Sequence, residues 1–434
     1  MTDVIVRKAT RLKGEVCAPP SKAYTQRMLI AAALSHGTST ISGPLISEDT
    51  QATLRAVKAL GVKVQATEDC WTVKGTNQLK GAKSPIDCGE SGATLRFMMP
   101  VSALALGSSV FVLGKSLEKR PIAPLIQSLK QLGVQASHQR LGGKTAIVVQ
   151  GGGISGGKTS IRGDLSSQFV SGLMFACPMA QAETEIILTT PLESKGYIQM
   201  TKGVLSEHGI KTSVLEGFDC LHIPSNQTYK PCDHRVPGDF SSAAFLLAAA
   251  AVIPSDVNVK NLDYAVFQGD NAVLEILKRM GVNGKVCPDH VEVERKGRLL
   301  EAVDVNAKDI PDLVPVCAVL ACYAKGTSKI CDAHRLRYKE SDRLLSLYLE
   351  LKKMGAQISI DENSLTVKGP CDLHGAVINP HNDHRIAMAC SVAALGASGE
   401  TRIQNAECVR KSYPKFFSDL RELGVDVVGG EFDR

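Results

Sequence analysis

The sequence predicts an α/β protein of two domains, and three observations lead to this prediction. The first is the length of 434 residues, which is too great for one ordinary core. The second is an internal repeat of about 72 residues that fills the chain six times. The third is the alternation of helical and strand patterns within each repeat. Each repeat is therefore expected to have the order βαβαββ.

A glycine that follows an amphipathic helical pattern marks each repeat. Two examples of the helical pattern are Asp270–Met280 and Asp342–Met354. The glycines are predicted to be left-handed C-caps, because glycine adopts that conformation without steric cost. They lie 69 to 76 residues apart, at Gly61, Gly133, Gly209, Gly281, Gly355 and Gly424.

The segment after each glycine alternates apolar and polar residues, as in Gln357–Lys368, and predicts two short strands around a polar turn. Each repeat also holds a second helical segment that is apolar on all sides and is therefore expected to be buried on all sides. These segments are Arg27–Ser35, Leu95–Leu106, Gln168–Ala180, Ser242–Ile253, Leu313–Ala324 and Arg385–Leu395. One helix of each pair should lie inside each domain, with the sheets outside.

Three repeats per domain give two domains of about 200 residues, divided near Tyr229–Pro237. The first strand, within Asp3–Arg11, precedes the first repeat and could complete either domain. A solenoid of stacked repeats is the alternative architecture, but solenoid repeats run to roughly 20 to 50 residues and these are longer.

Composition excludes several classes of protein. A hydrophobic fraction of 44% with 22% charged residues is typical of a globular chain and excludes disorder, collagen and coiled coil. The longest apolar stretches, such as Ala243–Ile253, are shorter than the roughly 20 residues that span a bilayer. The N-terminus lacks an apolar signal segment, so a cytoplasmic protein is expected. A net charge of +6 without basic runs argues against nucleic acid binding.

The thirteen cysteines are expected to be reduced rather than paired or metal-bound. Their number is odd and no C-x-x-C motif occurs. Most lie in apolar runs, where a thiol behaves as a small hydrophobic group, for example Cys177, Cys317, Cys322 and Cys390.

Polar and basic residues gather where helices are predicted to begin. Plain helix capping explains Ser21, Ser166, Asp239, Asp309 and Asp383. Capping does not explain cations, which are mildly unfavourable near the positive end of a helix and favour a bound anion there. Seven cations follow this pattern in both halves of the chain: Lys22, Arg27, Arg120, Lys339, Arg343, Arg385 and Lys411. We expect them to converge on a pair of anionic ligands between the domains; a solvated ion-pair cluster at Lys339–Arg343 is the alternative.

The segment Gly152–Thr159 satisfies the pattern of a phosphate-binding P-loop. A true P-loop continues directly into a helix, whereas this chain continues through Ser160 to Gly163 and Asp164. The position within the repeat predicts a strand here, so nucleotide binding is disfavoured.

Nine motifs occur in order along the chain and together carry a resemblance to a known family. They are Pro20-Ser21-Lys22 with Arg27, Gly89–Arg96, Lys119-Arg120-Pro121, Ser166-Ser167-Gln168, Ser194 with Tyr197, Asp309–Asp312, Lys339–Arg343, Asn382–Arg385 and Lys411. The whole chain resembles the 5-enolpyruvylshikimate-3-phosphate synthases, which transfer the enolpyruvyl group of phosphoenolpyruvate to shikimate 3-phosphate. The resemblance implies a two-domain inside-out α/β barrel, with domain I at residues 18–233 and domain II at residues 1–17 and 234–434.

The resemblance also implies roles for individual residues. The catalytic set would be Lys22, Asp312 and Glu340. Shikimate 3-phosphate would be bound by Lys22, Arg27, Ser166, Ser167, Gln168, Ser194, Tyr197, Asp312, Arg335 and Lys339. Phosphoenolpyruvate would be bound by Lys22, Gly92, Arg120, Gln168, Arg343, Arg385 and Lys411. No metal or cofactor is expected, and the chain should act as a monomer on these two small molecules, with neither nucleic acid nor membrane as a partner.

Three positions depart from the family pattern. Ala23 stands where most members carry serine, Glu90 replaces an asparagine beside the expected phosphoenolpyruvate site, and Arg335 replaces an asparagine that commonly contacts shikimate 3-phosphate. Glu90 should weaken anion binding unless it turns outward. Gly92 keeps the backbone open beside the expected phosphate, which is compatible with glyphosate sensitivity.

Two other functions are weighed against this one. The related transferase that acts on UDP-N-acetylglucosamine carries a loop cysteine before its Arg-Pro motif, and Gly114–Arg120 has none. A non-catalytic binding protein of the same fold would not need Lys22, Asp312, Glu340 and Lys411 together.

Overall fold

The computed structural model describes residues 2–214, 216–297 and 299–432, and the chain forms a mixed α/β fold. It divides into two compact units. Unit 1 comprises residues 1–20 and 237–434, and unit 2 comprises residues 21–236. Unit 1 is therefore built from both ends of the chain, whereas unit 2 is one continuous segment.

Unit 2 contains six α-helices and three four-stranded sheets. The helices are α1 (Lys22–Leu34), α2 (Glu48–Ala59), α3 (Gly92–Ala103), α4 (Ala123–Gln131), α5 (Ser167–Ala176) and α6 (Lys195–Glu207). The first sheet has the order β14 (His234–Arg235), β3 (Thr38–Ser42), β5 (Cys70–Lys74) and β4 (Lys63–Ala66). The second has the order β6 (Ile86–Asp87), β7 (Ser108–Val112), β9 (Lys144–Gln150) and β8 (Ala136–Leu141). The third has the order β10 (Gly157–Ile161), β11 (Thr184–Leu188), β13 (Cys220–Ile223) and β12 (Ser213–Val214).

Unit 1 repeats this organisation. Its helices are α7 (Phe240–Val252), α8 (Ala272–Arg279), α9 (Val314–Cys322), α10 (Arg343–Lys353), α11 (His384–Ala394) and α12 (Phe416–Glu422). One sheet has the order β16 (Gly284–Val286), β17 (His290–Arg295), β15 (Ser255–Lys260) and β2 (Leu12–Cys17). Another has the order β18 (Leu300–Glu301), β20 (Ala324–Cys331), β22 (Leu365–Gly369) and β21 (Ile358–Ile360), with β19 (Val305–Asn306) also on β20. The last has the order β23 (Val377–Ile378), β24 (Glu400–Ile403), β1 (Val4–Arg7) and β25 (Val427–Val428).

The six sheets share one pattern of strand directions. In each, a parallel pair such as β6 and β7 is followed by antiparallel neighbours such as β9 and β8. Two sheets take their parallel edge strand from a distant segment, since β14 pairs with β3 and β2 pairs with β15. The expected order βαβαββ therefore holds once three strands are exchanged along the chain, because β1 also completes the last sheet between β24 and β25. Among the described residues, each strand order is open and no sheet closes into a barrel.

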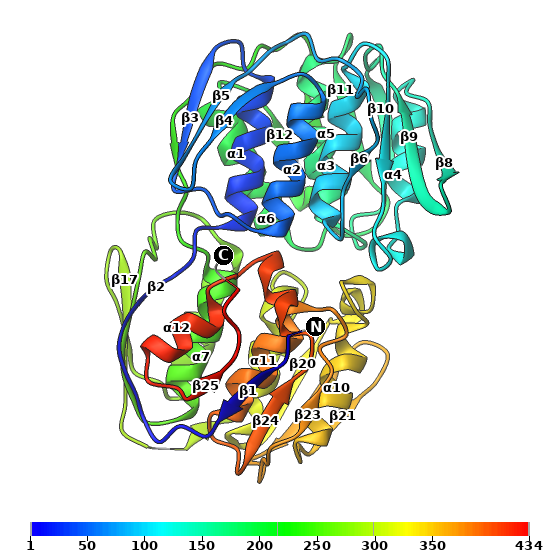
Figure 1. The fold of residues 1–434 in the computed structure, drawn as a ribbon. Helices are drawn as coiled ribbons and strands as arrows, with labels where there is room; N and C mark the ends of the chain where they lie inside the picture. The colour runs from blue at the N-terminus through cyan, green and yellow to red at the C-terminus, as the bar shows by residue number, and fades with distance from the viewer. Residues whose placement is uncertain (1, 215, 298, 433–434) are drawn as a thin grey trace. The chain divides into compact units, whose positions relative to one another are not determined.

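The apolar helices form the core, as predicted from their composition. Every residue of α7, α9 and α11 is buried, and these three helices contact one another. In unit 2, α1, α2, α3, α5 and α6 contact each other in turn and run side by side in Figure 1. The helices α1, α3 and α5 are almost wholly buried because they carry no continuous polar face.

The predicted glycine C-caps are confirmed by the backbone. All six repeat glycines have positive φ between 77° and 94° and follow the end of a helix. The segment with the P-loop pattern is not a P-loop, as predicted. Gly157–Ile161 is strand β10, and no helix follows it directly.

Cys177, Cys317, Cys322 and Cys390 are buried, as expected. Burial raises the pKa of Cys177 and Cys317 to about 12, which keeps these thiols protonated. No helix in the described part of the chain combines the length and the apolar character that a membrane span requires.

Candidate active site

The N-terminus of α1 carries the first predicted site residue. Ser21 is the N-cap and its hydroxyl accepts a hydrogen bond from the amide of Tyr24 at 3.5 Å. Lys22 is the first helical residue, and its Nζ lies 3.0 Å from Oδ2 of Asp49 in the first turn of α2. The lysine is thus held by a carboxylate that sequence reasoning did not identify.

Arg27 lies one turn further along α1 and is 2% exposed. Its Nε donates to the Thr201 hydroxyl at 2.9 Å, and its other nitrogens donate to the carbonyls of Ala23 and Tyr197. The guanidinium also lies over the rings of Phe97 and Tyr197. Burial lowers the pKa of Arg27 to about 10, so the side chain remains charged at neutral pH.

A second group surrounds the N-terminus of α3. A β-carbon built on Gly92 would lie 3.1 Å from Nη1 of Arg120, 3.4 Å from Nη1 of Arg96 and 3.6 Å from Oε1 of Gln168. Arg96 Nη1 donates to Gln168 Oε1 at 2.8 Å and to the Ser166 hydroxyl at 3.4 Å. The structure therefore brings together Gly92, Arg120, Gln168 and Ser166, and adds Arg96 to them.

The carboxylate of Glu90 is held by hydrogen bonds to the loop that precedes Arg120. Its oxygens accept hydrogen bonds from the amide and hydroxyl of Ser116 and from the amide of Leu117. These donors lie at the start of the short 3₁₀ helix Leu117–Lys119, where a carboxylate is favourable. The departure at position 90 thus stabilises the loop that precedes Arg120.

The remaining predicted residues of unit 2 lie at helix starts. Ser166 caps α5 and accepts from the amide of Gln168 at 3.3 Å, while Ser167 is the first, buried residue of that helix. Ser194 precedes α6 with a left-handed φ of 56° and is buried. Such a conformation is uncommon outside glycine and often marks functional positions. Tyr197 lies in the first turn of α6.

In unit 1, Asp312 is the centre of a group of cations. Its Oδ1 accepts from Arg343 Nη1 at 2.9 Å and from Lys339 Nζ at 3.3 Å. Its Oδ2 lies 3.5 Å from Nη2 of Arg385, and its carbonyl accepts from Nη1 of the same arginine at 3.2 Å. Three predicted cations thus meet one predicted carboxylate.

Arg343 connects this group to two further carboxylates. Its Nη2 donates to Glu340 at 2.6 Å and its Nε donates to Asp383 at 2.9 Å. Burial alone would lower the pKa of Arg343, but Asp383, Glu340 and Asp312 raise it above its usual value. The ion-pair cluster weighed as an alternative is therefore present in these residues, but it is centred on a buried arginine rather than solvated.

Lys339 lies outside α10, which begins at Arg343, so the two cations meet through Asp312 and not along a helix face. Burial, together with Arg343 and Arg335, lowers the pKa of Lys339 to about 8 in spite of Asp312. Arg335 itself is 5% exposed, in the short helix His334–Tyr338. Lys411 is 4% exposed and donates to the carbonyl of Asn382.

Asp270 joins this group without having been predicted. Its carboxylate accepts from the Ser241 hydroxyl, and burial and the charge of Asp312 raise its pKa to about 6. In the sequence, Asp270 is recognisable only as an aspartate at the start of an amphipathic helical pattern. An aspartate that merely caps a helix would look the same. The predicted residues thus form groups within each unit, and the residues missed are mainly their carboxylate and arginine neighbours.

Comparison with known proteins identifies the family of the chain. Residues 6–420 match the family described as EPSP synthase (3-phosphoshikimate 1-carboxyvinyltransferase). The 3-phosphoshikimate 1-carboxyvinyltransferase of Methanocaldococcus jannaschii is 42% identical over 427 residues, covering 98% of this chain and 99% of the relative. The protein of the same description from Methanocorpusculum labreanum is 41% identical with the same coverage.

Solved structures give the same result for the fold. EPSP synthase from Acinetobacter baumannii superposes with a TM-score of 0.81 at 26% identity, over 99% of this chain and 100% of that one. The enolpyruvyl transferase NikO from Streptomyces tendae has a TM-score of 0.76 at 19% identity, covering 99% of this chain and 98% of that one, which is a likeness of fold alone. The chain therefore belongs to the EPSP synthase (3-phosphoshikimate 1-carboxyvinyltransferase) family.

Proposed function

We propose that this chain transfers the enolpyruvyl group of phosphoenolpyruvate to the 5-hydroxyl of shikimate 3-phosphate and releases phosphate, in the shikimate pathway that leads to chorismate and aromatic amino acids. The observation that carries the proposal is the arrangement of Lys339, Arg343 and Arg385 around Asp312. It places a carboxylate that can accept a proton among cations that can hold anionic substrates.

Shikimate 3-phosphate is bound, in this proposal, by ten residues. The hydroxyl and amide donors at the starts of α5 and α6 suit a phosphate and sugar-like hydroxyl groups. The residues are Lys22, Arg27, Ser166, Ser167, Gln168, Ser194, Tyr197, Asp312, Arg335 and Lys339. The burial of Arg27 and its fixed hydrogen bonds support a role in holding one defined orientation.

Phosphoenolpyruvate is bound by a second set that is richer in arginine. Arginine suits phosphate and carboxylate because its planar donors bind two oxygens at once. The residues are Lys22, Gly92, Arg120, Gln168, Arg343, Arg385 and Lys411. The lack of a side chain on Gly92, beside Arg120 and Gln168, leaves room for the ligand's phosphate.

The reaction needs a base, an acid and stabilisation of negative charge. The oxygen of the 5-hydroxyl group bonds to C2 of phosphoenolpyruvate while Asp312 accepts the hydroxyl proton. Glu340 protonates C3 in the same step. Glu340, now a carboxylate, then takes a proton back from C3 as the C2–O bond to phosphate breaks, which restores the double bond. Lys22 and the arginines stabilise the departing phosphate. Together the two substrates carry roughly five or six negative charges, which seven cations can match.

The proposal is tested by measuring phosphate release with phosphoenolpyruvate and either shikimate 3-phosphate or UDP-N-acetylglucosamine as acceptor. Phosphate release with shikimate 3-phosphate alone is expected. Release only with the nucleotide sugar would assign the related transferase reaction, and no release with either acceptor would support a non-catalytic protein.

We also propose that the enzyme is a cytoplasmic monomer. Its reaction uses no metal or cofactor, and it has no nucleic acid or membrane partner. Each unit is, in this proposal, an inside-out α/β barrel. The fully buried α7, α9 and α11 support the barrel arrangement, and so do strands such as β15 and β24, which alternate buried and more exposed residues. Light scattering of the purified chain tests the monomer.

A further inference from the structure

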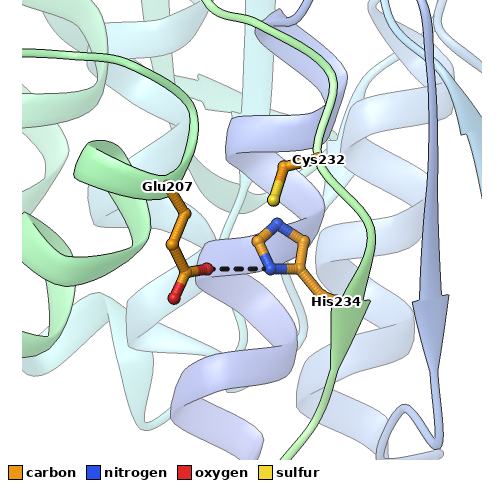
Figure 2. Close-up of side chains that lie close together, drawn as sticks. All are labelled: Glu207, Cys232 and His234. Atoms are coloured by element: carbon orange, nitrogen blue, oxygen red, sulfur yellow. Dashed lines mark ion pairs between the residues drawn. The ribbon is translucent and has the colours of Figure 1, made fainter.

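Three potential metal ligands lie together in unit 2, away from the residues assigned to the substrates. One ligand atom each from Glu207, Cys232 and His234 lies within 4.8 Å of the others. Glu207 is the last residue of α6, whereas Cys232 and His234 belong to the segment that forms β14 (Figure 2). Cys232 lies two residues before His234, just ahead of the strand, and its Sγ lies within 4.8 Å of the ligand atoms of His234 and Glu207.

When both histidines are neutral, the hydrogen bonds around His234 leave its Nδ1 atom without a proton opposite the carboxylate of Glu207. The Nδ1 atom of buried His208 lies 2.7 Å from the carbonyl oxygen of Lys230, which can only accept, so Nδ1 carries a proton. In neutral His208 the Nε2 atom then accepts from Nε2 of His234 at 2.8 Å. The remaining Nδ1 of His234 faces Glu207 Oε2 at 3.0 Å.

This last contact brings two lone pairs together unless a cation separates them or a proton joins them. With its Nε2 proton donated to His208, neutral His234 has no proton on Nδ1 to offer the carboxylate. An additional proton on His234, His208 or Glu207 would relieve this contact, and so would a metal ion bound in place of that proton. A histidine that binds metal through one nitrogen and donates its other N–H to a neighbour is the usual arrangement in protein metal sites.

We propose that Glu207, Cys232 and His234 bind a zinc ion, with His208 as the outer hydrogen-bond partner of His234. Imidazole, thiolate and carboxylate are the ligands of protein zinc sites, and three protein ligands leave one position for water. Ligand atoms around tetrahedral zinc lie about 3.3 to 3.8 Å apart, so side-chain adjustments of about 1 Å suffice here. Because Glu207 is exposed, zinc has access from solvent.

The zinc ion would tie the C-terminal end of α6 to the segment that carries β14. This strand is only two residues long and pairs with β3 at the edge of its sheet. The amide of Cys232 donates to Ser39, and the amide of Thr40 donates to Asp233, so the segment already follows β3. A zinc ion bound by Cys232, His234 and Glu207 would also hold this segment to α6, in addition to its contacts with β3.

A second cluster, Cys287, His290 and Glu292, offers the same ligand types and serves as the comparison. Both ring nitrogens of His290 already face carboxylates, Asp289 and Glu292, and Lys285 lies 3.2 Å from Glu292. The hydrogen bonds to Asp289 and Glu292 raise the pKa of His290, and the doubly protonated ring can donate to both carboxylates. This partly exposed ion-pair network therefore needs no metal ion to balance it. We expect no zinc binding there.

The test is titration of the chelator-treated, full-length protein with zinc, followed by elemental analysis after gel filtration. We expect one zinc ion per chain and a rise in Tm on binding. With Co²⁺ as the probe we expect a thiolate-to-cobalt charge-transfer band. Zinc should also protect Cys232 from alkylation, as mapped by mass spectrometry. Failure to bind zinc would overturn the proposal and leave an additional proton on His234, His208 or Glu207 to relieve the contact.

Variants locate the site. His208→Gln removes an outer partner and should weaken zinc binding by roughly 10- to 100-fold. Cys232→Ser removes a ligand, so it should weaken zinc binding by more than this and should abolish the charge-transfer band. The matched variant Cys287→Ser should bind zinc like the unmodified chain. Normal binding by Cys232→Ser, or lost binding by Cys287→Ser, would overturn the proposal. Alkylation of the unmodified chain gives the same answer if a variant fails to fold.

Discussion

Arg343 donates a hydrogen bond from Nη1 to Oδ1 of Asp312 at 2.9 Å, and its guanidinium also contacts Glu340 and Asp383. One fully buried cation therefore orients both residues to which we assign the proton transfers. The guanidinium can do this because its donors lie in a fixed plane and point in several directions.

Replacing Arg343 with methionine should destabilise unit 1, because it leaves three buried or half-buried carboxylates without their shared cation. Loss of one partner from a buried ion pair costs about 3 to 5 kcal/mol. For a unit of this size we expect Tm to fall by roughly 6 to 20 °C in calorimetry. Arg402→Met is the control, since Arg402 forms only an exposed pair with Asp3 at 3.8 Å. An equal fall in Tm for both variants would show that the ion pairs of Arg343 do not stabilise unit 1.

Asp312→Asn should lower kcat by roughly 100- to 10,000-fold, because the amide cannot accept the hydroxyl proton. The amide oxygen can still accept from Arg343, so substrate binding measured by calorimetry should change little. The matched variant Asp309→Asn, at an exposed position three residues earlier, should retain normal turnover. Turnover within 10-fold of normal in Asp312→Asn would remove this residue from the role of base.

The affinity for shikimate 3-phosphate should fall as pH rises through about 8. The pKa of Lys339 is lowered to about 8, so the side chain is charged below this pH and neutral above it. Only the charged form attracts the substrate phosphate. The KM for shikimate 3-phosphate, measured between pH 7 and 9.5, should therefore rise above about pH 8.

Lys339→Arg provides the control for this pH dependence, because arginine stays charged across the whole range. Its KM is expected to stay flat with pH, whatever its absolute value. A rise of KM in the variant that matches the rise in the unmodified chain would assign the effect to another group.

Gly92→Ala should raise the KM for phosphoenolpyruvate by about 10-fold, equivalent to about 1.4 kcal/mol. The added methyl group would lie 3.1 Å from Arg120 Nη1 and would displace the arginine from the ligand. The KM for shikimate 3-phosphate should change less. Gly203→Ala in α6 is the control, since its added methyl group meets nothing within 4 Å. Equal changes in both KM values would contradict this placement of the ligand.

Local signals in the sequence predicted most of the helices and their ends. Gly281 and Gly355 illustrate why: each ends an amphipathic helix in a left-handed conformation that few other residues adopt. The strand at Gly157–Ile161 was predicted against a misleading P-loop pattern, because the repeat fixed its position. These features depend on neighbours close in sequence, which a single chain reveals.

Other features depend on contacts between distant residues and left no local signal. Strand β14 has two residues, too few for any alternation pattern, and is a strand only because β3 offers an edge to it. Asp49 holds Lys22 from another helix, and Arg96 reaches Gln168 from a position that resembles any buried helix residue. The chemistry of these sites could be inferred from motifs, but their partners could not.

The position of β1 has a consequence for how the protein is made. Val4 lies opposite Ile403 in the last sheet, so β1 cannot pair with β24 until the segment that carries Ile403 has also been translated. At about 5 to 20 residues per second this delay is roughly 20 to 80 seconds. Every strand of unit 2 comes from residues 21–236, so that unit can complete its sheets while β1 is still waiting. The nascent chain therefore exposes the apolar strand β1 throughout this delay, and chaperones that bind such segments should engage it there.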